Sequence, residues 1–271
     1  MLNRKRNSGA TALVALALVA VGARAENTSC ERLPGYSALK TALTVATAAE
    51  GSGLNHHMWG TIVDRDGNVC AVAFSGANRG AQWPGSRVIS AQKANTANAF
   101  SLDSSSNSGG SGQATGLALS TANLYSAVNP GGSLYGLQAS NPVDTSVAYK
   151  GPSSNYGSAH DPMVGSKIGG VNVFGGGLAL YGAGKVILGA VGVSGDTSCA
   201  DHNIAWRVRK LLALDHLKGV GGVSGDADRP DNIIFDITPN PNGGTGKSAG
   251  GFGHPTCINT GDASLLPAVQ P

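Results

Sequence analysis

Charged side chains are scarce in this sequence, since Asp, Glu, Lys and Arg make up only 13% of its 271 residues. There are 19 basic and 16 acidic residues, and four of the basic ones lie within the first 25 positions. Beyond position 25 the chain therefore holds 15 basic and 16 acidic residues, a net charge of −1. Proteins that bind nucleic acid or anionic lipid concentrate positive charge on one surface. We expect neither of these partners.

Long apolar runs are missing beyond position 25, so no segment there is predicted to insert into a membrane. Before that point, three basic residues at 4–6 precede an apolar run from Ala10 to Gly22. Ala23 and Ala25 then supply the small side chains that a signal peptidase accepts at a cleavage site. The run is too short for a membrane-spanning helix. The sequence predicts a signal peptide over residues 1–25 and an exported protein, periplasmic or extracellular.

Aromatic residues are also few, at 5%, whereas glycine contributes 41 residues. So many small residues favour tight turns, close approach of backbone segments and long polar loops. The 246 residues after the predicted cleavage site suffice for one large domain with appendages. We expect a single domain over residues 26–271.

Four cysteines remain after cleavage, and an even number in an oxidising compartment favours disulfides. Three pairings are possible. We favour Cys199 with Cys257, which by elimination leaves Cys30 with Cys70.

A zinc site is the alternative to a disulfide at one of these pairs. The spacings Cys199-x-x-His202 and His254-x-x-Cys257 bring two cysteines and two histidines into a pattern that tetrahedral zinc sites use. Export favours the disulfide, because thiols oxidise outside the cytoplasm. The sequence leaves both open.

Periodicity and turn signals predict the following elements. Helices are expected over 36–50, 86–100 and 199–212, and paired strands over 57–63 with 68–75 and over 178–181 with 186–193. The order helix, hairpin, helix, loop, hairpin, helix is typical of an α+β sandwich in which helices flank an antiparallel sheet. A doubly wound parallel sheet is not expected.

Two segments fall outside this pattern. Residues 101–167 are rich in Ser, Gly and other turn formers, with a short helix expected at 117–128. Loops of such length are usually functional or mobile. Residues 213–271 form an extension with one strand-like run, 232–237.

Familiar catalytic motifs are incomplete. Ser194 is followed two positions later by Asp196 rather than by the glycine of a nucleophile elbow, which argues against a serine hydrolase. Residues 243–248 imitate the end of a phosphate loop but lack its first glycine and its helix. His57, at the start of the first predicted strand, is a candidate axial ligand for haem iron or a metal, and a half-exposed histidine without such a role is the alternative.

Three segments resemble the GlcG/HbpS family, also called the haem-degrading family. They are Ile62–Asn68, Ser90–Phe100, and Gly169–Gly195 with Asp201 shortly after it. With the first helix, the resemblance covers about residues 36–212. The long loop and the extension mark the chain as similar to a larger, exported variant.

The resemblance implies a profilin-like α+β fold, homo-oligomers, and binding of haem or a related tetrapyrrole. Some members of the family break haem down, and exported members sense haem or iron together with a signalling partner, so the resemblance implies these roles as well. Carried over to this sequence, the resemblance implies a ligand-binding pocket at Lys93, Thr96, Ser194, Gly195 and Asp201.

Within that pocket, Lys93 could pair with a propionate of the ligand, and a close-approach turn at Gly192, Ser194 and Gly195 would admit a flat molecule. The alternative is an internal ion pair between Lys93 and Asp201, with glycines that only permit packing. His202 is a second candidate for an axial ligand. The resulting expectation is an exported haem-binding protein; the alternative is an enzyme or accessory protein for a small periplasmic metabolite.

Overall fold

The computed structural model describes residues 29–103, 116–244 and 246–271, so the predicted signal peptide lies outside the described residues. Its main elements are α1 (Tyr36–Ala48), β1 (Trp59–Asp64), β2 (Val69–Phe74), α2 (Ser86–Phe100), β3 (Gly177–Gly182), β4 (Val186–Ser194) and α6 (Ser198–Leu211). These seven elements are called the core below. Their order and bounds agree closely with the order and bounds predicted from sequence.

Within the described residues, the core strands form one antiparallel sheet in the order β2-β1-β4-β3. β1 pairs with β2 and with β4, so that Ile62 lies opposite Ala71 on one side and Val191 on the other. The Asp-Gly turn that joins β1 to β2 is fixed by Asp64, whose Oδ1 accepts the backbone N–H groups of Asp66 and Asn68 at 3.0 and 2.8 Å. Asp64 therefore serves the turn locally.

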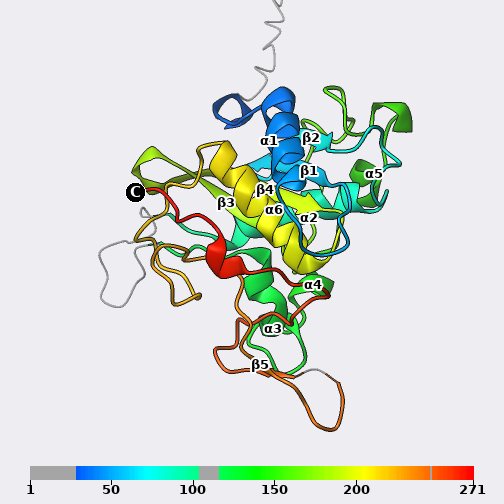
Figure 1. The fold of residues 1–271 in the computed structure, drawn as a ribbon. Coiled ribbons are helices and arrows are strands. Elements are labelled where there is room, and N and C mark those ends of the chain that lie inside the picture. The colour runs from blue at the N-terminus through cyan, green and yellow to red at the C-terminus, as the bar shows by residue number, and fades with distance from the viewer. Residues whose placement is uncertain (1–28, 104–115, 245) are drawn as a thin grey trace, which may run out of the picture.

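Helices cover both faces of this sheet, as Figure 1 shows. α1 and α6 pack together on one face, where Leu39, Leu43, Ile62 and Val191 belong to the main apolar cluster. α2 packs on the other face, against a cluster that contains Val63 and neighbouring small residues. The alternation of side chains along each strand thus feeds two apolar layers. The expected α+β sandwich is confirmed.

The inserted segment, 101–167, is more ordered than its composition predicts. Its described part contains α3 (Tyr125–Val128), α4 (Leu137–Ser140) and α5 (Thr145–Ala148), with 3₁₀ turns at Thr121–Leu124 and Ser153–Asn155. The helix expected at 117–128 is therefore shorter and begins as a 3₁₀ turn. Ala148 and Met163 are buried against the α2 face of the sheet.

The extension, 213–271, lies along α6 and returns to β3, where the N–H of His216 donates to the carbonyl of Tyr181. The strand predicted at 232–237 is wrong: only Ile237–Thr238 forms a strand, β5, paired with β6 (Lys247–Ser248). The physical reason is that Asp231 and Asn232 are buried and bond to side chains of α6 instead of to a neighbouring strand.

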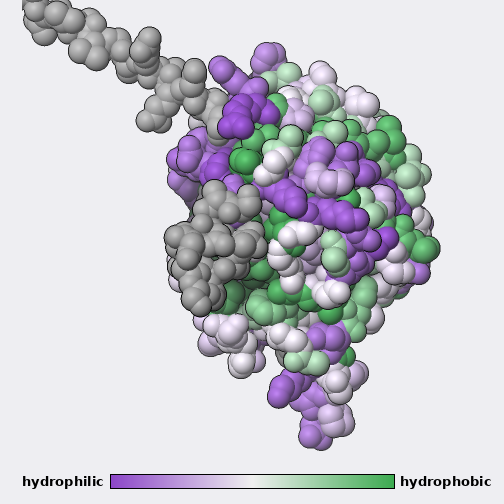
Figure 2. All heavy atoms as spheres, turned by 90° about the vertical axis from the view of Figure 1, so that its left-hand side faces the viewer, coloured by the Kyte–Doolittle hydropathy of each residue, from purple (hydrophilic) through white to green (hydrophobic). Residues whose placement is uncertain are grey.

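The turn between β5 and β6 projects from the body of the protein (Figure 1). The face seen in Figure 2 intersperses hydrophilic and hydrophobic residues, and this projection is mostly hydrophilic. Among the described helices, none is long and apolar enough to span a membrane.

Both disulfides join the pairs favoured from sequence, Cys30 with Cys70 and Cys199 with Cys257. The first ties the segment before α1 to β2. The second ties the extension to the first turn of α6.

Candidate functional site

Lys93 and Asp201 form a buried ion pair between α2 and α6. Lys93 Nζ lies 2.6 Å from Asp201 Oδ2 and also donates to the carbonyl of Val193 at 3.0 Å. Asp201 Oδ1 accepts the backbone N–H of Asp196 at 2.9 Å. Both side chains are almost fully buried. Of the two arrangements considered for these residues, the structure contains the internal ion pair.

Burial favours the neutral form of both side chains. It lowers the pKa of Lys93, and the nearby Asp201 carboxylate only partly offsets this. It raises the pKa of Asp201 to about 6, although Lys93 and the hydrogen bond from Asp196 act the other way. A ligand propionate could reach Lys93 only by displacing Asp201, and an unpaired buried carboxylate is costly. The pair therefore holds α2 and α6 together as the protein stands.

The glycines of the β4 region also serve close packing. A Cβ at Gly192 would lie 1.9 Å from the carbonyl oxygen of Ser90, and one at Gly195 would lie 2.4 Å from that of His57. Gly192 is part of β4 rather than of a turn, so the expected turn is confined to the residues after Ser194. The backbone does come close to other atoms at these two glycines, but those atoms belong to α2 and to the backbone of His57, so no space is left for a ligand.

Thr96 and His202 are likewise enclosed. Thr96 Oγ1 donates to the carbonyl of Gln92 at 2.8 Å and accepts the N–H of Asn172 at 3.0 Å. His202 Nε2 lies 3.1 Å from Asn232 Oδ1, and its Nδ1 has no partner among the described residues. Burial lowers the pKa of His202 to about 4, so the ring is neutral near pH 7. The extension, through Asn232, covers this histidine.

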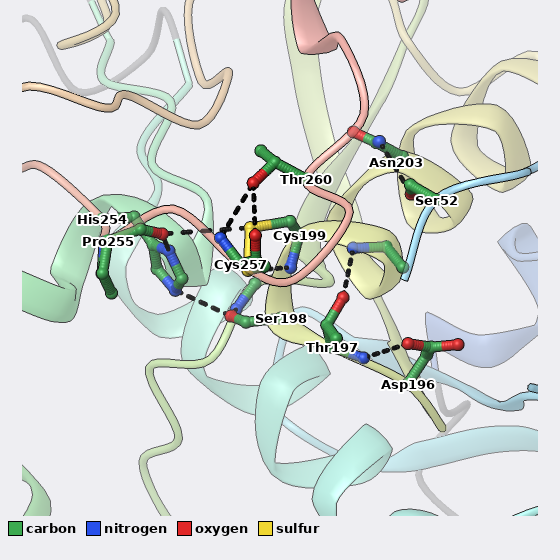
Figure 3. Close-up of a disulfide and its surroundings, with 12 residues drawn as sticks. Ser52, Asp196, Thr197, Ser198, Cys199, Asn203, His254, Pro255, Cys257 and Thr260 are labelled. Atoms are coloured by element: carbon green, nitrogen blue, oxygen red, sulfur yellow. Dashed lines mark hydrogen bonds between the residues drawn. A yellow bond between two sulfur atoms is a disulfide. The ribbon is translucent and has the colours of Figure 1, made fainter. Parts of the chain in front are cut away.

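The disulfide in Figure 3 uses the two sulfurs that a zinc site would need. His254 lies beside Cys199 and Cys257, but a zinc ion binds thiolates, which the disulfide removes. His254 instead places Nε2 2.7 Å from Ser198 Oγ, at the start of α6. Disulfide and hydrogen bond together fasten the extension over α6.

His57 differs from the other candidates because its side chain is exposed. It lies on the rim of a cavity of about 260 Å³ at the end of α1, lined also by His56, Met58, Ser75 and Asp196. His57 Nδ1 is 3.3 Å from Ser75 Oγ, and Nε2 makes no hydrogen bond within the described part of the chain. The ring is thus held at one nitrogen and open at the other.

Asp196 holds the loop that carries His57, a role that sequence analysis missed. Its carboxylate accepts the N–H groups of Leu54 and His56 at 2.8 and 2.9 Å. The available signal was an aspartate directly after the Gly-Val-Ser-Gly run and before Thr197, the N-cap of α6. Nothing in the linear pattern connects it to residues about 140 positions earlier.

The family model of haem-degrading HbpS-like proteins matches residues 38–209, more than half of the chain. The chain belongs to this family. No curated protein is significantly similar to it in sequence.

Solved structures with a similar arrangement are distant. Klebsiella pneumoniae protein ORFY is 23% identical, with 66% of this chain and 90% of that one covered and a TM-score of 0.41. A PduOC:heme complex is 21% identical, with 65% and 90% covered and a TM-score of 0.41. A double mutant of HbpS from Streptomyces reticuli is 18% identical, with 75% and 99% covered and a TM-score of 0.38.

The inserted segment and the extension of this HbpS-like chain differ in whether the family match includes them. The inserted segment lies inside the matched range, whereas the extension from 213 onward lies outside it. The residue that covers His202, Asn232, therefore belongs to the part of this chain that the family pattern does not describe.

Proposed function

We propose that this HbpS-like protein is an exported binding protein for haem or a related tetrapyrrole, and that His57 supplies the ligand to iron. Membership of the haem-degrading HbpS-like family supports this ligand class. The observation that carries the assignment to His57 is its exposure, because every other residue predicted for the site is buried. The two disulfides suit an oxidising compartment outside the cytoplasm.

The hydrogen bond at Nδ1 of His57 favours this role. If Nδ1–H donates to Ser75 Oγ, the lone pair of Nε2 is free and exposed, which is how metal-bound histidines are usually oriented. Ser75 Oγ is itself fixed, because it accepts the N–H of Met58 at 2.9 Å. When bound, haem iron would supply the redox chemistry.

The surface near His57 has side chains that a flat apolar ligand could cover. Trp83 is 49% exposed and Leu54 is 44% exposed. His56 contacts the edge of Trp83, with ring centroids 4.8 Å apart. The small cavity would receive at most an edge of a tetrapyrrole, so we expect the ring to lie over this rim.

The test is a titration of hemin into purified protein of residues 26–271, followed by absorption spectroscopy in the presence and absence of reductant. We expect a saturable Soret band that shifts on reduction. His57→Ala should abolish the ligand signature, because it removes the nitrogen donor. His160→Ala, at another exposed histidine, should leave the spectrum unchanged.

Two results would contradict the proposal: no saturable Soret band in the unaltered protein, or an identical band in the His57→Ala variant. The first would favour the small-metabolite enzyme or the accessory protein. The second would keep haem binding and reject His57 as the iron ligand.

A further inference from the structure

A second cavity, larger than the one at His57, lies on the α2 face of the sheet. Its volume is about 660 Å³, in the range of small-molecule sites. The start of β1, the loop before α2, the start of α2 and the inserted segment form its walls. Its lining includes Trp59, Arg79, Arg87, Tyr149 and Tyr156. None of its lining residues is shared with the His57 cavity.

Trp59, at the start of β1, lines the inner wall of this cavity. The side chain is 1% exposed, and its indole N–H meets no acceptor within the described residues. An unsatisfied buried donor costs about 1–3 kcal/mol. The indole nitrogen is closed to solvent, so Trp59 contributes ring surface to the cavity wall and no accessible donor.

The two arginines of the cavity differ in their charge balance. Arg87 Nε donates to Asp161 Oδ2 at 2.8 Å, and its guanidinium also stacks 3.6 Å from the centre of the Tyr156 ring. Arg79 is exposed and forms no ion pair with an acidic residue of the described chain. The cavity mouth therefore carries a positive charge that no neighbouring carboxylate neutralises.

Aromatic rings make up much of the rest of the lining. Tyr149 is 61% exposed although it lines the cavity, and Tyr156 is half-buried beside Arg87. The Tyr156 hydroxyl donates to the carbonyl of Tyr149 at 3.0 Å, which holds the two residues together. Flat aromatic molecules pack well on such surfaces, by offset or edge-to-face contact.

We propose that this cavity binds an aromatic carboxylate of one or two rings. Its ring packs against Tyr149 and Tyr156, and its carboxylate pairs with Arg79. The inference is independent of haem binding, because it concerns a different cavity and different residues.

The test is isothermal titration calorimetry with 2-naphthoate and, for comparison, its uncharged analogue 2-naphthalenemethanol. We expect saturable 1:1 binding of 2-naphthoate and at least about tenfold weaker binding of the alcohol, because the alcohol lacks the charge-assisted contact. Arg79→Ala should remove that preference. Arg32→Ala, which deletes an exposed arginine elsewhere, should leave it intact.

Variants of the aromatic lining test the position of the ligand. Tyr149→Ala should weaken 2-naphthoate binding by about fivefold or more, whereas Tyr135→Ala, at another exposed tyrosine, should not.

The proposal is overturned by the absence of saturable heat with 2-naphthoate in the unaltered protein. It is also overturned if Arg79→Ala and Tyr149→Ala bind as tightly as their control variants, because the molecule then binds elsewhere. Neither result bears on the hemin titration, which depends on His57.

Discussion

The inserted segment and the extension attach to the core by the same chemistry but leave different surfaces behind. In each case an arginine of a core helix pairs with an aspartate of the added segment. Arg87 of α2 pairs with Asp161 of the insert, and Arg209 of α6 pairs with Asp231 of the extension. All four side chains are buried. Beside the first pair a cavity stays open, whereas beside the second pair His202 is covered.

The extension is fastened to α6 at several points. The extension is held to α6 also by the Cys199–Cys257 disulfide and by the Trp206 indole N–H, which donates to the carbonyl of Pro267 at 2.9 Å. With contacts spread along the helix, it leaves no room above His202. The burial of His202 thus depends on the extension.

The largest expected effect comes from breaking the anchor of the extension. Arg209→Met leaves Asp231 buried without its partner, from which it now accepts bonds at 2.6 and 2.9 Å. We expect the free energy of unfolding to fall by about 3–5 kcal/mol. Urea denaturation followed by circular dichroism measures it.

Lys210→Met is the matched control, one position further along α6. Lys210 also pairs with the extension, at 3.1 Å from Asp215, but its side chain is 37% exposed. A loss of about 1 kcal/mol or less is expected. Equal losses in the two variants would contradict the view that the buried pair is the principal ionic anchor.

The second effect concerns the covalent anchor, which joins residues 58 positions apart. Replacing both Cys199 and Cys257 by Ala should cost about 2–4 kcal/mol, mainly because the unfolded chain gains freedom. Hydrogen exchange should also become faster in the extension. Replacing Cys30 and Cys70 by Ala is the control, and exchange in the extension should then stay slow. Unchanged exchange in the first variant would show that the disulfide does not hold the cover in place.

The smallest expected effect is a pH dependence of stability that results from the burial of His202 under the extension. The pKa of this ring is about 4 in the folded protein against 6.5 in an unfolded chain. Between these values the unfolded state binds the additional proton, so stability decreases as pH falls from 6.5 toward 4. His202 should account for about 2 kcal/mol of the loss between pH 7 and pH 5. In the His202→Gln variant, the free energy of unfolding should fall by about 2 kcal/mol less between pH 7 and pH 5 than in the unaltered protein. If the two proteins lose the same amount over this range, the His202 ring is not buried as the structure has it.

Most of the core fold is predictable because its signals are local. The Asp-Gly turn sets the first hairpin, and apolar spacing sets the helices, so predicted and observed bounds differ by only a few residues. The strand predicted at 232–237 failed for the opposite reason. Ile233 and its neighbours have strand-forming side chains, but Ile233 packs in the apolar cluster that contains residues of α6, and no strand forms in this run before Ile237.

The site was less predictable than the fold. Sequence correctly named Lys93 and Asp201 as a possible internal pair, yet it could not choose between that pair and a ligand pocket, since both need the same two residues. The cavity around Trp59 gave no linear signal at all. Its walls come from positions as far apart as 59 and 156, and only folding brings them together.

The sequence by itself determined the α+β class, the two hairpins and the HbpS-like resemblance, because periodicity, turn chemistry and residue type act over short spans. The tertiary structure alone decided which candidate side chains are accessible. Exposure depends on what packs on a residue from distant parts of the chain, and Asn232 and Ser75 show it: the first encloses His202, and the second holds one nitrogen of His57 while the other stays open.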